Sequence, residues 1–270
     1  MVLRLNPQLP VVWRTPTSMQ FGVSTPPVVL NDLDLATEKL IAALSSGISR
    51  SGLGMIGRSA GASDAQIDAL LDHLAPVLLQ PPRVQHSTVV VTGVGRLADR
   101  TVAVLAATGT PVVVARTPDE AERASCTLAI AIGHFVLDPG YYGLWLRRDL
   151  PHLPVVLGDS SVAVGPFIEP GSTACLYCLQ RHANDADSAW PAIASQLWGR
   201  RSALDTELVA SEVAAIVARF ALARLQGDAA SASDQLVIDG ATGQQSRRDF
   251  AVHPDCGCLE LAAPRGEAQR

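Results

Sequence analysis

The sequence predicts an α/β protein made of two parts that differ in their patterning. Residues 1–80 combine short strand-like pieces with helical patterns, whereas residues 84–262 alternate buried-strand signals with helical stretches. Strands that alternate with helices along a chain are typical of a parallel, doubly wound sheet. Between the two parts, Gln80-Pro81-Pro82-Arg83 is the predicted linker, because consecutive prolines interrupt both helices and strands.

The first part predicts a small winged-helix module. Its strand-like pieces, which Pro and Gly separate, lie at residues 2–5, 19–23 and 28–30. Three helical patterns follow, at residues 34–43, 53–59 and 63–74. The last begins at Ser63, a favoured capping residue, and carries Ile67, Leu70 and Leu71 at helical spacing. Short strands and three helices in so few residues fit a winged helix.

The second part predicts a Rossmann-like domain. Its buried-strand signals lie at residues 88–91, 111–115, 128–132 and 155–157. A helical stretch at residues 206–225 and strand-like pieces at 235–239 and 247–252 complete it. This order of elements predicts a sheet with helices packed on its faces.

Composition excludes several classes of function. The chain has 270 residues, of which 48% are hydrophobic and 17% charged, so it can form a packed core. Its formal net charge is -5 and it has no basic run, which argues against a general affinity for nucleic acid. We find no secretory signal and no apolar run of membrane-spanning length, so we expect a cytoplasmic protein with no membrane partner.

A glycine turn follows the first buried strand. Thr92-Gly93-Val94-Gly95-Arg96 leads from that strand into a helix, where glycines let backbone amides approach phosphate. Gly93 and Gly95 are therefore the candidate nucleotide-binding residues. However, the next strand ends in Arg116 instead of a ribose-binding acid, and the third leads into Gly133-His134-Phe135 without a carboxylate for magnesium. The pattern favours a structural turn over bound ATP or NAD.

Four of the five cysteines form two close pairs, Cys175-Leu-Tyr-Cys178 and Cys256-Gly-Cys258. In a reducing cytoplasm, clustered cysteines are more often metal ligands than disulfides. Four thiolates give the closed tetrahedral shell of a structural zinc site, with no position for a reactive water. The alternative is a redox pair at Cys175 and Cys178. Cys126 is predicted to be a small core residue.

No catalytic residue is predicted. His134, His152, His182 and His253 are scattered along the chain and form no triad or metal-ligand spacing. His253 lies beside the second cysteine pair, where we expect it to support the site rather than bind the ion.

These residues carry a family resemblance. The segment from Gly165 to Leu179 (GPFIEPGSTACLYCL), followed by Arg181 and Trp190-Pro191, resembles the signature of cyclodehydratase-associated proteins. Those proteins are similar to the ThiF and MoeB family of ubiquitin-activating-type adenylating enzymes and serve in the biosynthesis of thiazole/oxazole-modified microcins (TOMMs). The opening residues 3–7, with Trp13-Arg14 and residues 20–22, resemble that group's leader-binding module.

The resemblance implies a division of labour. An N-terminal winged helix, a RiPP recognition element, would bind the leader of a ribosomally made precursor peptide. A Rossmann-like domain of the adenylating-enzyme type would carry the structural zinc, and a separate YcaO cyclodehydratase would use ATP to form azolines. The chain would then be a non-catalytic scaffold without ATP. It would self-associate as a homodimer, for which helix 206–225 is a candidate surface; burial of that helix in its own domain is the alternative.

The physics of leader binding indicates where the groove should lie. An extended peptide can add as a strand to an exposed sheet edge while its side chains enter a neighbouring groove. We expect this groove between the strand Val28-Val29-Leu30 and the helix that carries Ile67, Leu70 and Leu71. The alternative is that these apolar residues form the core of the module.

Three other functions stay open at this stage. The first is an active ATP-dependent adenylating enzyme acting on a peptide or carrier-protein terminus, and the second is an NAD(P)-dependent oxidoreductase. The third is a DNA-binding regulator, since winged helices often read DNA; the acidic charge and the lack of Arg and Lys at residues 67–74 argue against it.

Overall fold

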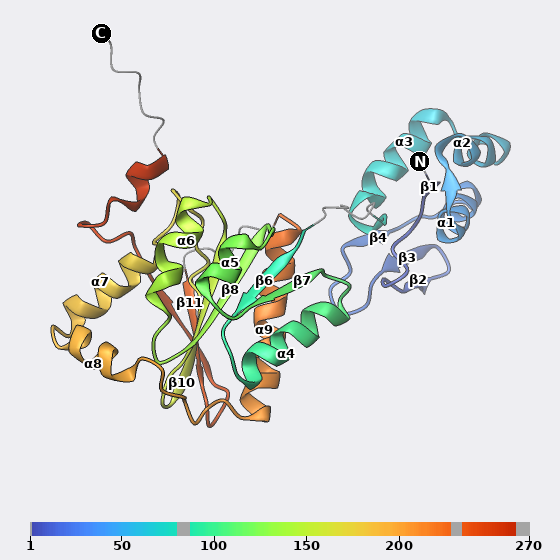
Figure 1. The fold of residues 1–270 in the computed structure, drawn as a ribbon. Helices are drawn as coiled ribbons and strands as arrows, with labels where there is room; N and C mark the ends of the chain where they lie inside the picture. The colour runs from blue at the N-terminus through green and yellow to red at the C-terminus, as the bar shows by residue number, and fades with distance from the viewer. Residues whose placement is uncertain (1, 80–86, 228–233, 263–270) are drawn as a thin grey trace, which may run out of the picture. The chain divides into compact units, whose positions relative to one another are not determined.

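A computed structural model describes residues 2–79, 87–227 and 234–262 (Figure 1). They belong to two compact units, Met1–Arg83 and Val84–Arg270, which are treated separately below. The predicted linker at residues 80–83 lies outside the described residues. Within the described part of the chain, no helix combines the length and apolarity that a membrane span needs.

The N-terminal unit packs three helices against small antiparallel sheets. Its three-stranded sheet has the order β2-β3-β4, formed by β2 (Val11–Thr15), β3 (Ser18–Phe21) and β4 (Val28–Leu30). A two-stranded sheet joins β1 (Val2–Leu3) to β5 (Ile48–Ser49). The helices are α1 (Leu35–Ser46), α2 (Arg50–Ser59) and α3 (Asp64–Leu74), followed by the short η1 (Ala75–Val77). The winged-helix assignment stays a prediction.

Local sequence explains where these helices begin. The side chains of Asp34, Ser49 and Ser63 each accept a hydrogen bond from a backbone N–H in the first turn of the helix that follows. Close packing of α2 on α3 requires Gly57, because a Cβ there would lie 2.5 Å from the Cδ1 atom of Ile67. The unit therefore has its own hydrophobic core, which includes Phe21, Leu40, Leu44, Leu53, Ile67 and Leu74.

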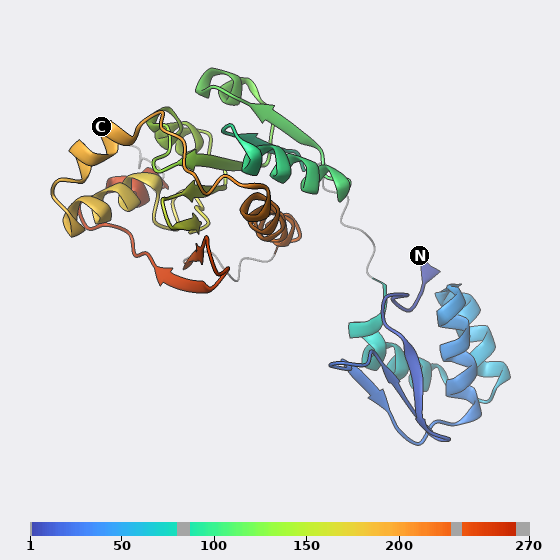
Figure 2. The ribbon, with the colours of Figure 1, turned by 90° about the horizontal axis from the view of Figure 1, so that it is seen from below.

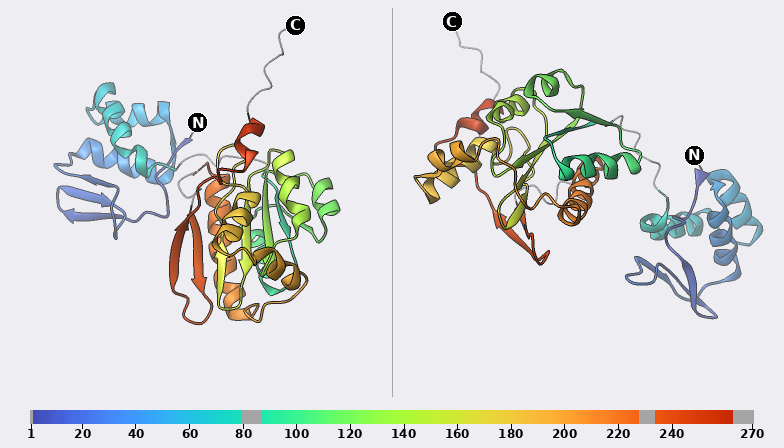
Figure 3. Two further views of the ribbon diagram at one scale, coloured as in Figure 1. Left: turned by 90° about the vertical axis from the view of Figure 1, so that its left-hand side faces the viewer. Right: turned by 60° about the horizontal axis from the view of Figure 1, so that its bottom comes forward.

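The C-terminal unit is built on a seven-stranded mixed sheet with the order β12-β11-β10-β9-β8-β6-β7. Its parallel strands are β6 (Val89–Thr92), β7 (Val112–Ala115), β8 (Leu128–His134) and β9 (His152–Leu157). Its antiparallel strands are β10 (Ser161–Val164), β11 (Asp234–Asp239) and β12 (Gln245–Asp249). Figure 3 shows β11 and β12 at one edge of this sheet.

The expectation of parallel strands is confirmed for the four buried-strand signals, which form β6 to β9, but the complete sheet is mixed because three further strands are antiparallel. After β9 the chain reverses in a tight turn, where Gly158 N–H donates to the carbonyl of Ser161. A turn this short can join only antiparallel strands, because a parallel connection needs a crossover of a dozen residues or more. The mixed sheet is consistent with a Rossmann-like domain.

Helices cover the sheet. On one face, α4 (Arg96–Ala107) packs beside α9 (Glu207–Leu225), as Figure 2 shows. Other helical segments are α5 (Pro118–Arg123), η2 (Pro139–Tyr141), α6 (Tyr142–Arg147), α7 (Leu176–Ala186), α8 (Trp190–Leu197) and η3 (Gly257–Ala262). α9 buries seven residues within its own unit, which is the alternative that the sequence left open for this helix.

Candidate metal centre and the pocket at the glycine turn

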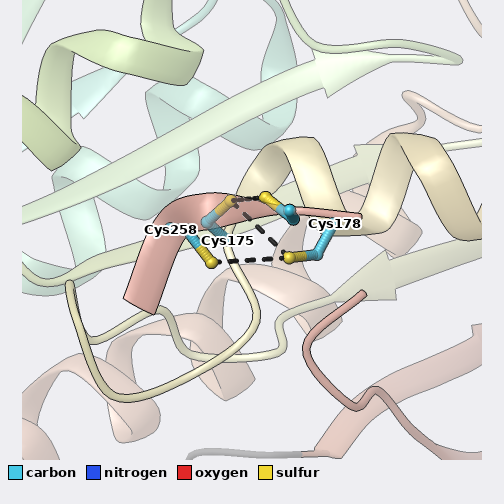
Figure 4. Close-up of side chains that lie close together, drawn as sticks. Cys175, Cys178 and Cys258 are labelled. Atoms are coloured by element: carbon cyan, nitrogen blue, oxygen red, sulfur yellow. Dashed lines mark hydrogen bonds between the residues drawn. The ribbon is translucent and has the colours of Figure 1, made fainter. Parts of the chain in front are cut away.

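The cysteine cluster joins two segments that are distant in the sequence. Cys175 is the N-cap residue of α7, Cys178 lies in the first turn of that helix, and Cys258 lies in η3 (Figure 4). Cys256 comes directly before η3. The Sγ atom of Cys175 lies 3.8 Å from that of Cys178 and 3.7 Å from that of Cys256, and the Sγ atoms of Cys178 and Cys258 are 3.6 Å apart. All four sulfur atoms lie within 4.8 Å of one another.

These distances fit one tetrahedral metal ion. Four sulfur ligands at about 2.3 Å from a zinc ion would be separated by about 3.8 Å along each edge of the tetrahedron. A disulfide, in contrast, would require an S–S distance of about 2.05 Å. The cluster therefore has the spacing of a ligand set, and the four cysteines could hold a metal ion such as zinc.

Burial changes the pKa values of the clustered cysteines. It raises the pKa of Cys175 well above that of a free thiol and raises the pKa of Cys258 to about 11. Burial also acts to raise the pKa of Cys178, but backbone hydrogen bonds from His253 and Cys175 and side-chain hydrogen bonds with Cys256 and Cys258 together lower that pKa. Four thiolates would repel one another in this interior, so a cation is required to stabilise the ionised form.

His253 supports the cluster instead of completing it. Its side chain is 3% exposed, and its Nε2 atom lies 2.9 Å from Oδ2 of Asp185. Its Nδ1 atom accepts from the backbone N–H of Asp255 at 3.1 Å, so both ring nitrogens are engaged. Cys126 lies outside the cluster, in the partly buried region beneath α5 and α6.

The glycine turn brings the N-terminus of α4 against an acid from a distant loop. The backbone N–H groups of Arg96 and Leu97 donate to Oδ2 and Oδ1 of Asp205, each at 2.9 Å. Gly95 has a φ of 119°, and a Cβ there would lie 2.2 Å from Oδ2 of Asp205. Gly93 has a φ of 108°, and a Cβ there would lie 2.3 Å from the carbonyl oxygen of Ile132. Both glycines are therefore required by the turn itself.

A cavity of about 220 Å³ lies beside this turn, at the carboxyl ends of β6, β7 and β8. Rossmann-like sheets commonly bind ligands at this edge. Its charged lining residues are Arg116, Asp138, Arg200 and Arg201, and Trp198 adds an exposed aromatic ring. The cavity is smaller than the roughly 300 Å³ at which small-molecule pockets usually begin.

Asp138 corrects one expectation from the sequence. No carboxylate was expected after the third strand, yet Asp138 lines the cavity only four residues beyond His134. Phe135 adopts a φ of 62° and Val136 forms a bridge back to His134, so the chain turns sharply at this point. The carboxylate of Asp138 accepts from the N–H of Gly140 at 2.8 Å. A residue in an irregular turn carries no periodic signal that could have revealed its position.

The six predicted groove residues of the N-terminal unit differ in burial. Val28 and Ile67 are 4% and 0% exposed and belong to the core, whereas the other four are half-buried: Val29, Leu30, Leu70 and Leu71. All except Val29 belong to, or pack against, the same hydrophobic cluster. A hollow of about 610 Å³ is lined by Leu71 together with Leu3, Ser49, Arg50, Ser51 and Leu78.

Comparison of the sequence with protein-family models and with curated proteins gives no match. Solved structures share its fold. The heterocyclase TruD is 17% identical with a TM-score of 0.65, covering 96% of this chain and 42% of that one. A heterocyclase in complex with substrate and cofactor is 15% identical with a TM-score of 0.67, covering 96% and 39%. The E. coli MccB structure with ATP is 11% identical with a TM-score of 0.62, covering 96% and 99%.

These likenesses establish the class of fold. The chain has the α/β architecture of the heterocyclase TruD and of MccB over nearly its whole length. It spans about two fifths of the heterocyclase chains that it matches. At identities of 17% and below, the shared property is the fold.

Proposed function

We propose that this chain is the recognition subunit of a TOMM cyclodehydratase. It binds the leader of a ribosomal precursor peptide and presents that peptide to a separate YcaO partner, which performs the ATP-dependent cyclisation. The cytoplasm is its proposed location. In this proposal residues 1–80 are a winged-helix recognition element, and residues 84–262 are a ThiF-like domain that does no chemistry of its own.

The open edge of β4 carries this proposal. β4 ends the three-stranded sheet, and no described strand of the chain pairs with its outer edge. Val29 and Leu30 on this strand are half-buried, as are Leu70 and Leu71 on α3. An extended leader that pairs with β4 would gain backbone hydrogen bonds, and its apolar side chains would cover these residues.

The heterocyclase chains extend well beyond the region that this chain matches, since they are covered to 42% and 39%. In this proposal the cyclisation belongs to a YcaO protein that acts in trans. The four-cysteine cluster is assigned to one structural zinc ion, because a closed sulfur shell leaves no ligand position for a substrate.

A peptide titration tests the proposal directly. The probe is a fluorescently labelled synthetic leader of a short Cys/Ser/Thr-rich precursor, to be sought together with a YcaO gene beside the gene for this chain. We expect saturable binding to the full chain and none by a peptide of the same composition in scrambled order. Absence of binding by the chain, both alone and with its YcaO partner, would remove the proposal.

Hydrogen exchange locates the leader without any substitution. Backbone amides at residues 28–30 should become protected when the leader is added. β2, the opposite edge of the same sheet, supplies the internal control, because its amides at residues 11–15 should exchange as before. Protection of β2 instead of β4 would reject the predicted groove while leaving peptide binding intact.

One observation favours a second candidate, an active adenylating enzyme. Asp138 lies in the cavity at the carboxyl ends of the parallel strands, where a carboxylate could assist magnesium. ATP–pyrophosphate exchange by the isolated chain is the deciding assay. Exchange that depends on the peptide would establish the adenylating activity and exclude the scaffold role.

A further inference from the structure

We infer that Asp205 is the resident ligand of the glycine turn and closes this turn to the phosphate chain of a nucleotide. In Rossmann-like proteins the amides at this position meet a phosphate. Here the two oxygen atoms of one carboxylate accept from both of the first two amides of α4, at 2.9 Å each. The inference concerns only the C-terminal unit and does not depend on leader binding.

The carboxylate of Asp205 supplies the negative charge that a bound phosphate would otherwise bring to the amides of the turn. The side chain of Asp205 is 11% exposed, so the charge is largely removed from water. It lies at the positive end of the α4 dipole, where a negative charge is stabilised. A phosphate group that approached these amides would meet the Asp205 oxygen atoms at the same position and would be repelled by their charge.

The loop that carries Asp205 is fastened to the turn at several points. Arg201 Nη1 donates to the carbonyl of Val94 at 3.0 Å, and the backbone N–H of Ser202 donates to Nδ1 of His134 at 3.2 Å. With Nδ1 accepting, the Nε2 atom of His134 carries the proton and donates to Val94, also at 3.0 Å. Arg96 Nη1 adds a bond to the backbone carbonyl of Asp205 at 3.2 Å. The acid is therefore positioned before any external anion arrives.

Such a tethered carboxylate competes for the two amides far better than a free anion in solution does. The loop holds it in bonding geometry, so its binding costs no translational entropy. An external phosphate must displace it and also break the contacts that hold the loop. This geometry explains how a nucleotide-binding turn can retain both glycines and still exclude nucleotides: the glycines accommodate Asp205 instead.

Removing the carboxylate tests the inference. Inorganic pyrophosphate and ATP are titrated by calorimetry into the wild-type full chain and into Asp205→Ala, with the amide resonances of Arg96 and Leu97 followed by NMR. We expect no saturable binding to the wild type. Asp205→Ala should bind saturably, at least tenfold tighter than the weakest binding that the titration can detect, with shifts of both amide resonances. Asp205→Asn keeps an acceptor at the turn without the charge, so its affinity should be intermediate.

Glu207→Gln is the matched control. Glu207 lies in the first turn of α9 and pairs with Arg100 at 2.7 Å, and it also lies 3.6 Å from Arg96, but it accepts from neither α4 amide. Its substitution removes one negative charge near the same helix end and should leave the wild-type result unchanged. If Glu207→Gln gains as much affinity as Asp205→Ala, general electrostatics and not occupation of the turn is responsible.

Two results would overturn the inference. One is tight pyrophosphate binding by the wild type, which would mean that Asp205 does not close the turn. The other is folded Asp205→Ala or Asp205→Asn protein that binds no tighter than wild type, which would mean that the turn is not an anion site. Neither result bears on the leader titration, so the two proposals fail separately.

Discussion

The C-terminal unit brings polar groups together at two places, the cysteine cluster and the glycine turn. The two places differ in where the balancing charge comes from. At the cysteine cluster, three sulfur–sulfur distances are 3.6 to 3.8 Å, and the four thiols could hold a cation from outside the chain. At the glycine turn, two amide donors meet a carboxylate of the same chain. The first could be completed by an ion, whereas the second is completed by a group of the chain itself.

The cysteine cluster and the glycine turn therefore bear on different properties. The cluster concerns the stability of the unit, and the turn concerns its capacity to bind a phosphate. A metal ion held by the four cysteines would tie residues near 175 to residues near 256 and contribute to folding. A turn filled by its own acid contributes a helix cap and offers no site for a phosphate. Both features agree with the proposed scaffold role, in which a partner carries out the chemistry.

The largest expected effect comes from breaking the cysteine cluster. Cys178→Ser should abolish stoichiometric zinc and lower the free energy of unfolding by more than about 4 kcal/mol, because structural zinc binding is folding free energy. Metal analysis and thermal denaturation would measure both changes. Cys126→Ser is the control, since Cys126 lies outside the cluster and should leave zinc content unchanged. Pure, folded wild-type protein without zinc would reject the assignment.

A smaller loss of stability should follow when the pH is lowered, through a buried histidine on the side of the sheet that leads to the cysteine cluster. Burial lowers the pKa of His152 from 6.5 to about 4, and its backbone pairs with Ile168 on the segment leading to Cys175. Because the unfolded chain takes up a proton below pH 6.5 and the folded chain does not until about pH 4, stability is lost as pH falls between these values. The loss should reach about 3 kcal/mol.

Substitution distinguishes this histidine from the others. His152→Leu removes the titrating group, so the slope of unfolding free energy between pH 6.5 and 4 should flatten in denaturant titrations. His73→Gln, at an exposed position of α3, should keep the wild-type slope. An unchanged slope in His152→Leu would show that another group carries the acid sensitivity.

The smallest of the three effects should come from the glycine turn. Asp205→Ala removes two charge-assisted hydrogen bonds and should lower the free energy of unfolding by about 2 kcal/mol, while zinc content stays at the wild-type level. Glu207→Gln breaks only an exposed ion pair, which should change stability by less than about 1 kcal/mol. Loss of zinc from Asp205→Ala would show that the two ends of the unit are coupled.

Much of this arrangement could be predicted from local patterns. The valine-rich runs at residues 88–91 and 111–115 predicted β6 and β7 as buried strands, since such strands are almost continuously apolar. Burial is confirmed for β6 but wrong for β7, which is an edge strand with Val113 and Val114 exposed. The order of strands and helices fits the observed α/β sheet in its parallel half. The spacing of the two cysteine pairs predicted that they could share an ion, and the structure brings their sulfur atoms within 4.8 Å.

Other features could not be predicted, because they depend on residues brought together by folding. Asp205 lies more than 100 residues from the amides that it caps, so no local pattern connects them. Asp138 reaches the cavity through an irregular turn at Phe135. The sequence predicted no strand at β10 and no direction for β11 and β12, because the turn at Gly158 that reverses the chain has only a weak signal in sequence.

The sequence by itself determined the two-part α/β organisation, the glycines at positions 93 and 95, and the four cysteines that could hold a metal ion. Periodicity and short spacings are local properties, and a single chain displays them directly. Only the tertiary structure decided what each glycine accommodates and which acid faces the turn. Those answers depend on contacts between distant segments, where one carboxylate placed within 3 Å of two amides changes what the turn can bind.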